Sequence, residues 1–439
     1  MFRTLAITIG SIIVLAGTIR AGLDPSYSPH AVIDTVPFYE GAEYDPSIPV
    51  PNDYLKYSQG QWPLRYHELV KYLEILDTSS DRVKVEVHGS SYEDRPLYNV
   101  FISSEENIRN LEENRRKTDR LADPLAVSDS QELEQLVQGL PATAWMGYSI
   151  HGDEISGTDA AMQLIYHLTA ATDKATLNIL DNVVIIVDPS QNPDGRERYV
   201  SMLQTYKSKV PNYNRFSQQH GGVWPWGRTN HYLFDMNRDW ALVRLQETKS
   251  RIATIVKWHP QLSVDGHEMG SNATFLFSPP TDPINYNTPR HYFDWSPRFA
   301  ADQAAAFDQR GWPYYTGEWH EQWYPGYGSA WPTYSGSIGI LYEMAGVDGR
   351  FVKQRDDYLL TYHEAINKQF TSSIANLTTL ADNRVEILRD YHNARKLISN
   401  DGKRSKLAFL FKPDRDEVKM KRFIESLILQ GIEVKRTSA

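Results

Sequence analysis

Cysteine is absent from the 439-residue chain. Disulfide bonds, thiolate metal sites and cysteine nucleophiles are therefore excluded. Any metal ion would have to be held by histidine nitrogens and carboxylate oxygens. The chain also has no surplus of positive charge, because its formal net charge is −9 and its isoelectric point is about 5.8. Nucleic-acid binding needs a basic surface, so this balance argues against a nucleic-acid partner.

Long apolar runs are missing except near the N-terminus. Arg3 and the apolar stretch 5–17 after it are typical of a secretory signal, and those 13 residues are few for spanning a bilayer. Ile19-Arg-Ala21 forms an imperfect cleavage site. We expect residues 1–21 to be a signal peptide and the mature protein to be secreted or periplasmic, without a stable membrane span. An uncleaved membrane anchor is the alternative.

Aromatic residues are plentiful, with 11 Trp, 26 Tyr and 15 Phe. They crowd between Trp312 and Tyr342, where they could form a stacking surface for sugars or line a pocket. The alternative is a loop-rich core that buries its rings. The apolar fraction of 41% and the charged fraction of 23% are ordinary for a globular protein, and the length suits one large domain plus part of another.

Strand-like and helix-like patterns alternate over residues 61–398, which we predict to form the main domain. Strands are expected over 83–88, 97–103, 144–150, 182–188, 262–267 and 339–343, and helices over 65–76, 156–170, 246–258, 298–310 and most of 351–400. Residues 22–60 show no clear period and are expected to form an extended lead, while 119–139 is a polar surface insertion with some helix. Strands alternating with helices predict an α/β sheet covered on both faces.

The pattern restarts near residue 400. Residues 399–404 are linker-like, and 406–411, 417–430 and 432–435 predict a strand, a helix and a second strand. Such a βαβ unit cannot bury its faces alone. We therefore expect 399–439 to hold a linker and the truncated start of a second α/β domain.

The segment His151-Gly-Asp-Glu154 lies between a buried strand and the start of a helix. An imidazole and a carboxylate three residues apart can point the same way across one turn, and both are ordinary Zn²⁺ ligands. A catalytic zinc needs a third protein ligand and an open position for water. Alone the pair is a weak signal, because a histidine and a glutamate on a solvated turn would look the same.

Two later strands also end in chemically active side chains. One predicted strand ends in Asp-Gly-His267 and another ends in Tyr-Glu343. In an α/β sheet, ligands and catalytic groups gather beyond the carboxyl ends of the strands. The sequence therefore predicts that His151, His267 and Glu343 lie at one edge of the sheet.

These segments together resemble a known family, the zinc carboxypeptidases of the carboxypeptidase A type. The resemblance rests on 83–103, His151-x-x-Glu154, Asn192-Pro-Asp-Gly195, Asp235-Met-Asn-Arg238, His267 and Glu343, in that order. The spacing also fits, with 116 positions between the histidines (267 − 151) and 76 from the second to the acid (343 − 267). The resemblance covers about 60–370 and implies a mixed, mostly parallel twisted sheet with helices on both faces.

The resemblance implies a single zinc ion held by His151, Glu154 and His267, with water in the open position. Bound zinc lowers the pKa of such a water towards about 7 and polarises a carbonyl. Glu343 would then act as the general base and afterwards as the general acid. Asp235 would receive the free ring N–H of His151, as metal-bound histidines require; a helix cap or turn is its alternative role.

The resemblance also implies how a substrate is gripped. Asn237 and Arg238 would bind its terminal carboxylate, because a guanidinium grips a carboxylate with two parallel hydrogen bonds. An ion pair of Arg238 with Asp239 is the alternative. The arginine that stabilises the developing oxyanion would be Arg228, with Arg215 as the alternative.

A tyrosine that closes over the substrate would be Tyr324, with Tyr327 as the alternative. The stretch 328–334, where this family places its pocket floor, offers no acidic residue. That favours a bulky apolar or aromatic C-terminal side chain over a basic one. The remaining histidines, such as His220, His231, His259 and His320, are expected to be structural.

The sequence thus predicts an exported zinc metallocarboxypeptidase that acts on the C-terminus of a peptide or protein. One rival is a hydrolase of the same fold that cuts peptidoglycan peptides or another amide. A more distant rival is a non-catalytic glycan-binding module that uses the aromatic residues between 312 and 342.

Overall fold

The computed structural model describes residues 37–55, 57–127, 129–208, 212–405, 409–412 and 415–436. The chain divides into two units, 1–37 and 38–439, and the fold below is that of the second unit. The predicted signal peptide and the first part of the lead lie outside the described residues. The rest of the lead bridges Tyr44 to Ala171 and contains the short helix α3 (Pro51–Leu55).

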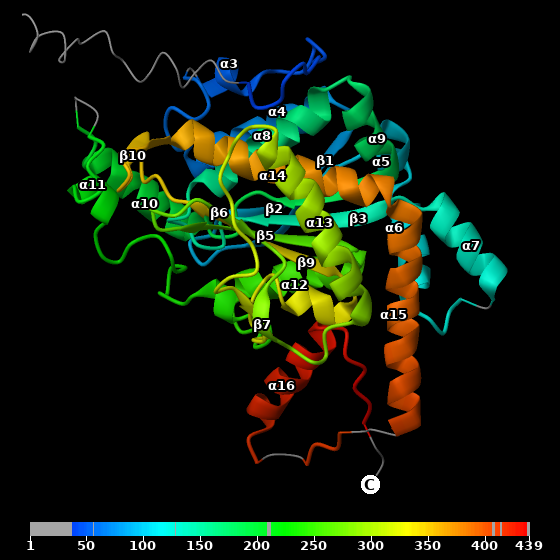
Figure 1. The fold of residues 1–439 in the computed structure, drawn as a ribbon. Coiled ribbons are helices and arrows are strands. Elements are labelled where there is room, and N and C mark those ends of the chain that lie inside the picture. Colours follow the sequence, from blue (N-terminus) through cyan, green and yellow to red (C-terminus); the bar gives the residue numbers. More distant parts are fainter. Residues whose placement is uncertain are drawn as a thin grey trace, which may run out of the picture. The chain divides into compact units, whose positions relative to one another are not determined.

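A seven-stranded sheet forms the centre of this unit (Figure 1). Its order is β1 (Val83–Ser90), β2 (Pro96–Ile102), β4 (Val183–Asp188), β3 (Ala142–Tyr148), β5 (Leu262–Met269), β9 (Ile338–Ala345) and β6 (Phe275–Phe277). The central strands β4, β3, β5 and β9 pair in parallel, whereas β1, β2 and β6 pair antiparallel at the edges. This mixed α/β sheet confirms the predicted fold class.

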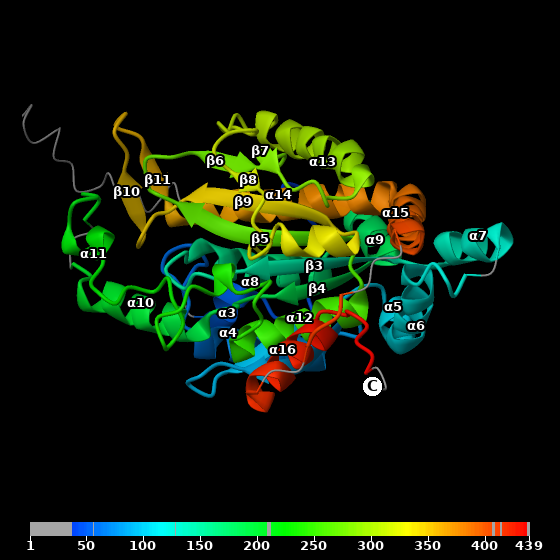
Figure 2. The ribbon, with the colours of Figure 1, turned by 90° about the horizontal axis from the view of Figure 1, so that it is seen from below.

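Alternation along the strands explains why both faces of the sheet are covered. Ala144 and Met146 of β3 belong to one apolar cluster, while Trp145 between them belongs to the other. The first cluster is completed by α4 (Tyr66–Ser79), α8 (Ser156–Ala170), α13 (Arg290–Asp308) and α14 (Tyr362–Asp382). The second is completed by α12 (Gln246–Trp258), which lies on the opposite side of the sheet (Figures 1 and 2).

The remaining elements are mostly connections and outer helices. They are α5 (Glu105–Arg109), α6 (Leu111–Ala122), α7 (Ser130–Gly139), α9 (Lys174–Asn182), α10 (Pro193–Thr205), α11 (Gln218–Gly221), η1 (Met236–Arg238), η2 (Trp331–Ser335), α15 (Arg384–Ser405), β7 (Thr281–Ile284), β8 (Glu321–Gln322), β10 (Phe351–Lys353) and β11 (Leu359–Thr361). Two predicted boundaries differ. Helix α13 begins eight residues before the predicted start and runs through Pro297, and β10 and β11 form a hairpin where helix was predicted.

The C-terminal segment agrees with the prediction only in its helix, α16 (Glu417–Leu429). Helix α15 runs through the predicted linker, and neither 409–412 nor 432–435 is a strand in the described chain. Neither stretch is paired in a sheet of the described chain, and residues 406–408 of the first predicted strand lie outside the described residues. Of the helices that the structure describes, none has the length and apolar character needed to cross a lipid bilayer.

Candidate metal centre and active site

The parallel strands β3, β5 and β9 bring the predicted residues to one edge of the sheet. Tyr148 of β3 pairs with Gly266 of β5, so the turn that follows β3 lies beside His267. His267 in turn pairs with Glu343 of β9. Register alone therefore places residues from three distant parts of the chain side by side.

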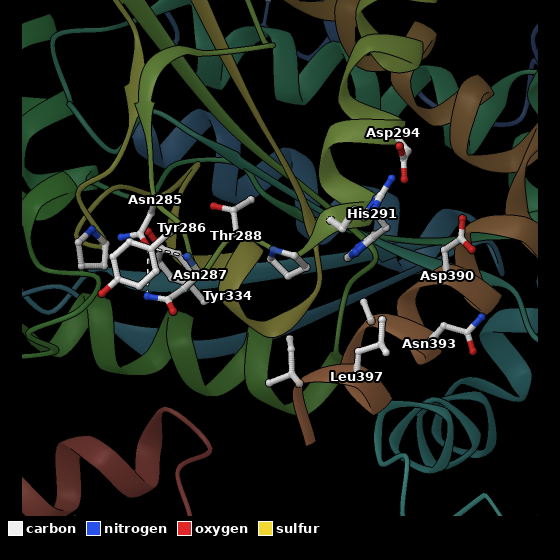
Figure 3. Close-up of a pocket in the computed structure, with 15 residues that line it drawn as sticks. Asn285, Tyr286, Asn287, Thr288, His291, Asp294, Tyr334, Asp390, Asn393 and Leu397 are labelled. Carbon is white, nitrogen blue, oxygen red and sulfur yellow. Dashed lines mark hydrogen bonds between the residues drawn. The ribbon is translucent and has the colours of Figure 1, made fainter. Parts of the chain in front are cut away.

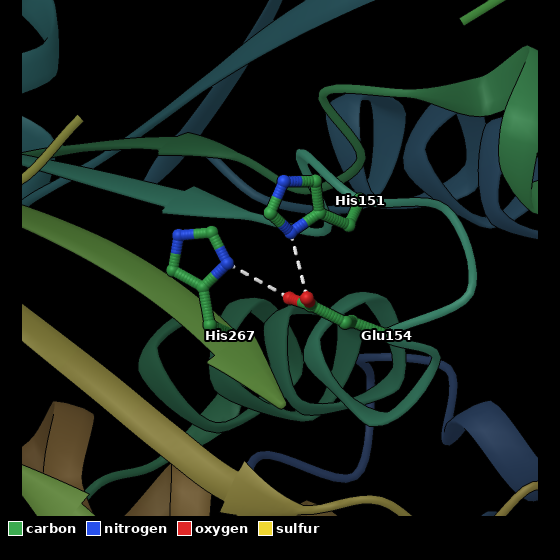
Figure 4. A group of neighbouring side chains, drawn as sticks. All are labelled: His151, Glu154 and His267. Atoms are coloured by element: carbon green, nitrogen blue, oxygen red, sulfur yellow. Dashed lines mark hydrogen bonds and ion pairs between the residues drawn. The ribbon is translucent and has the colours of Figure 1, made fainter. Parts of the chain in front are cut away.

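His151, Glu154 and His267 converge at this edge (Figure 4). The Glu154 carboxylate lies between the two rings, with Oε1 at 2.6 Å from His151 Nδ1 and Oε2 at 2.8 Å from His267 Nδ1. One ligand atom from each residue falls within 4.8 Å of the others. Two imidazole nitrogens and one carboxylate oxygen are the donor set of many catalytic zinc sites, so these residues fit a zinc ion.

The far side of each imidazole faces a second carboxylate. His151 Nε2 lies 3.0 Å from Asp235 Oδ1, and His267 Nε2 lies 2.9 Å from Asp265 Oδ2. An N–H donated on the Nε2 side leaves the Nδ1 lone pair pointing into the cluster, where a metal would take it. The prediction for Asp235 matches this geometry. Asp265 was missed, although its place two residues before His267 puts both on the same face of β5.

Charge in the cluster also suits a cation. Burial lowers the pKa of His267, but Asp265 and Glu154 outweigh it and raise that pKa well above its ordinary value. Burial raises the pKa of Glu154, but His151 and His267 outweigh it and hold the pKa below its ordinary value. The carboxylates therefore favour positive charge at the two Nδ1 atoms, which a bound metal ion supplies in place of protons.

Close backbone packing fixes the turn that carries His151 and Glu154. The Gly152 N–H donates to the Gly227 carbonyl at 3.0 Å, and a Cβ added to Gly152 would lie 2.2 Å from the backbone nitrogen of Arg196. Only glycine fits so close an approach. Asn192 caps α10 at the Gly195 N–H, so the motif 192–195 forms the platform against which this turn packs.

A buried ion pair holds the next part of the turn. Arg196 donates to the Ile155 carbonyl at 2.8 Å and to Asp159 Oδ2 at 2.7 Å. The Tyr362 hydroxyl also reaches the Ile155 carbonyl, at 3.0 Å, and Asp159 Oδ2, at 2.7 Å. Because Ile155 follows Glu154 directly, these contacts fix the backbone from which that carboxylate projects.

Glu343 lies in the wall of a cavity of about 560 Å³ that also exposes His151, Glu154 and His267. Burial raises the pKa of Glu343 to about 8. Its Oε2 atom has no hydrogen-bond partner among the described residues. The Glu343 carboxyl group therefore lies beside the metal-binding cluster, and its Oε2 atom is not hydrogen-bonded to another described residue.

Two arginines line the same cavity. Arg228 forms an ion pair with Asp235 at 3.0 Å, and its Nη1 atom lies 3.2 Å from His151 Nδ1. The alternative oxyanion-stabilising residue, Arg215, contacts Asn272 and does not line the cavity. Arg238 is half-exposed, stacks its guanidinium 4.8 Å from the centre of the Tyr327 ring, and donates to the Asn237 carbonyl.

Three sets of contacts bear on the predicted substrate-gripping residues and on the alternative role of Arg238, and both Asn237 and Arg238 line the cavity. The Asn237 amide nitrogen donates to Asp265 at 3.2 Å and its oxygen accepts the Gly328 N–H at 2.8 Å, so this side chain supports the cluster instead of standing free. The Tyr324 hydroxyl is bonded to the Arg238 carbonyl at 3.0 Å, and Tyr327 takes the place in the cavity wall. The ion pair of Arg238 with Asp239 is also absent, because Asp239 accepts backbone N–H groups at 244 and 245.

Acidic side chains enter the cavity from segments outside 328–334. Glu268 and Glu321 both line it. Glu268 accepts the Ser156 N–H at 2.7 Å, and Glu321 accepts the Trp323 N–H. The stretch 328–334 has no acidic residue, but the cavity as a whole does. The sequence could not reveal this, because both residues lie outside the stretch that the family resemblance aligns with the pocket floor.

His320, which the sequence led us to expect as a structural residue, lines the cavity. Burial lowers its pKa to about 4. The other three histidines have structural partners, as expected. His220 contacts the carbonyls of Val347 and Asn212, His231 contacts Glu93, and His259 contacts Asp119.

Comparisons with known proteins place the sequence in one family. The sequence model of the family described as zinc carboxypeptidase matches residues 69–330. A stretch of 131 residues, 30% of this chain, is 28% identical to the "Probable carboxypeptidase 2" of Arthroderma benhamiae, and equally to that of Trichophyton verrucosum. The match spans 20% of the length of those curated relatives.

Solved structures with similar chains include two bacterial proteins. A metallo-carboxypeptidase from Burkholderia cenocepacia is 12% identical, with a TM-score of 0.49 over 72% of this chain and 69% of that one. A metallo-carboxypeptidase from Pseudomonas aeruginosa is 15% identical, with a TM-score of 0.48 over 74% of this chain and 70% of that one.

Proposed function

The chain belongs to the zinc carboxypeptidase family, and from that premise we propose that it is an exported metallocarboxypeptidase that removes residues from the C-terminus of peptides. The observation that carries the proposal is the convergence of His151, Glu154 and His267 beside Glu343 in one cavity. A zinc ion bound by these three residues would polarise the scissile carbonyl and acidify a bound water.

The chain's own residues then divide the remaining work. Glu343 takes the proton of the attacking water and returns it to the leaving amine, which requires a carboxylate that faces the reaction centre. Asp235 and Asp265 keep the two imidazoles oriented through their Nε2 atoms. Arg228 lies close enough to the cluster to stabilise negative charge that develops on the carbonyl oxygen.

Arg238 is the candidate for binding the terminal carboxylate of the substrate. Its guanidinium lies at the cavity wall, supported on one face by the Tyr327 ring, and forms no short ion pair, since its distance to Asp235 is 3.9 Å. A planar guanidinium held in this way can accept a carboxylate through two parallel hydrogen bonds. Recognition of that end group is what makes a peptidase act at the C-terminus.

The test is zinc content together with hydrolysis of N-blocked dipeptides. We expect about one zinc ion per chain and, for Glu343→Gln, a loss of hydrolysis of about 10²–10⁴-fold with zinc retained. The exposed Glu318 offers a matched Glu→Gln control that should keep its activity. Full activity of Glu343→Gln with zinc bound would overturn the mechanism, and failure of the unaltered protein to cleave any C-terminal residue would overturn the proposed function.

Export rests on the N-terminal sequence alone. Expression of the full chain, followed by N-terminal sequencing of the protein found outside the cytoplasm, tests it. A new N-terminus near residue 21 is expected. A chain that stays in the cytoplasm with its first residues intact would rule out this part of the proposal.

A further inference from the structure

A second cavity, of about 860 Å³, has its own set of lining residues (Figure 3). Its walls come from the connection between β7 and α13, from the start of α13, from Pro325 and Tyr334 and from α15. No residue lines both cavities. A volume in this range is typical of sites that enclose small organic ligands.

The two cavities are neighbours because one loop contributes to both. Pro325 lines the second cavity, and Tyr327, two residues later, lines the metal-binding one. The second cavity and the metal-binding cavity therefore share this loop, which contributes one residue to the wall of each.

An exposed aromatic ring stands at the second cavity. Tyr286 is 83% exposed, and its ring contacts the half-exposed Trp323 edge-on with centroids 5.9 Å apart. Tyr334 lines the cavity from the other segment. A large ring left open to solvent beside a cavity is a stacking platform for a ligand with an apolar face.

The wall also holds buried polar atoms that lack partners. His291 Nε2 donates to the Gly336 carbonyl at 2.8 Å, which leaves Nδ1 as a hydrogen-bond acceptor. Neither His291 Nδ1 nor Thr288 Oγ1 finds a partner among the described residues, although both atoms are buried. A buried acceptor without a donor is unfavourable, so an enclosed water is expected at these two atoms, which the cavity's solvent does not reach.

The other polar side chains at this cavity can form hydrogen bonds with hydroxyl groups, and together they carry little net charge. Asn393 and Asp294 stand at its rim, and Asp390 accepts from the Trp295 indole at 2.9 Å. Arg290 offsets one of the two carboxylates. Two acids against one arginine disfavour a phosphate or carboxylate ligand, and the described residues form no metal-binding group here.

We propose that this cavity binds a neutral oligosaccharide. A sugar ring combines an apolar face, which stacks on Tyr286, with hydroxyl groups that can donate to Asp294 and pair with the Asn393 amide. Binding of the saccharide stands independently of hydrolysis. Its use to hold a sugar-linked peptide with the peptide end in the metal-binding cavity rests on the proposed function.

Calorimetric titration of the whole chain with the trimer of N-acetylglucosamine and with cellotriose tests the binding. We expect millimolar or tighter binding of at least one probe, weakened about 5–10-fold by Tyr286→Ala and about fivefold by Asn393→Ala. Tyr213 is half-exposed and lies outside this cavity, so Tyr213→Ala is the matched control and should bind as the unaltered chain does. No binding of either probe by the folded protein, or binding that both cavity variants leave unchanged, would overturn the proposal.

Hydrolysis of one peptide with and without an N-linked saccharide separates the two proposals. We expect a KM at least fivefold lower for the sugar-linked peptide, and we expect Tyr286→Ala to remove that advantage without changing kcat on the bare peptide. Equal KM values together with absent saccharide binding would refute the saccharide site and leave the proposed function intact. Saccharide binding without hydrolysis of either peptide would refute the proposed function alone.

Discussion

Asp265 gives the sharpest test of how the metal centre is built. Its side chain is fully buried, and Oδ2 lies 2.9 Å from His267 Nε2. Asp265→Asn keeps the shape and an acceptor oxygen but removes the negative charge. Partners of metal-bound histidines contribute about 10–100-fold to metal affinity. Water cannot replace a carboxylate in a closed site, so we expect a loss near 100-fold, which corresponds to about 2.7 kcal/mol.

The assay is competition for zinc between the protein and a chromophoric chelator of known affinity. Asp81 is exposed, so Asp81→Asn provides the same chemical change at a distant position and should leave zinc affinity unaltered. Unfolding of both variants in the metal-free state separates lost stability from lost metal binding. Zinc affinity of Asp265→Asn within about twofold of the unaltered chain would refute the orienting role of this carboxylate.

Three further perturbations follow from the packing around the site. Gly152→Ala should weaken zinc binding at least about tenfold and lower the free energy of unfolding by about 1–3 kcal/mol, because the added Cβ meets the backbone nitrogen of Arg196. Gly139→Ala is the control for both measurements, because a Cβ at Gly139 would lie in open space. Tyr362→Phe should lower the free energy of unfolding by about 1–3 kcal/mol in denaturant titration, because it removes the hydroxyl group that bonds to Asp159 and the Ile155 carbonyl. Tyr358→Phe, at an exposed ring, should lower it far less. Equal losses for the two variants would contradict this reasoning. Burial lowers the pKa of His167 to about 4, below an unfolded value of about 6.5, so its contribution to stability is complete above about pH 6.5 and is lost as pH falls to about 4. Unfolding measured at pH 7 and pH 4.5 should therefore show a loss of about 1–3 kcal/mol that His167→Gln reduces; an unchanged loss would exclude this histidine as the cause.

The structure changes the expected basis of substrate preference. Asn237 bonds to Asp265 and Gly328, whereas Arg238, which also lines the cavity, comes no closer than 3.9 Å to the Asp235 carboxylate. Glu268 and Glu321 add acidic groups to the cavity, whereas the sequence led us to expect a preference for an apolar or aromatic C-terminal side chain. A comparison of dipeptides ending in Phe and in Lys measures directly which character governs the preference.

Local chemistry explains what the sequence could determine by itself. The apolar runs before residues 151, 188, 267 and 343 are strands because both of their faces are buried, and such runs are legible without a structure. Their polar ends could be assigned to one edge of a sheet because parallel strands align their carboxyl ends. The ligand set His151, Glu154 and His267 and the acid Glu343 follow from that rule and from the family resemblance, and the structure brings all four into one cavity.

Tertiary structure alone decided the contacts made by side chains from unrelated segments. Whether Asn237 faces a substrate or Asp265, and whether Tyr324 or Tyr327 lines the cavity, depends on loop paths that no local pattern encodes. Glu268 and Glu321 enter the cavity for the same reason. Of the strands predicted over 406–411 and 432–435, the described residues 409–411 and 432–435 form none, because a strand requires a paired neighbour and the described chain provides none there. Period and spacing are properties of a segment, whereas the partner of a side chain is a property of the whole fold.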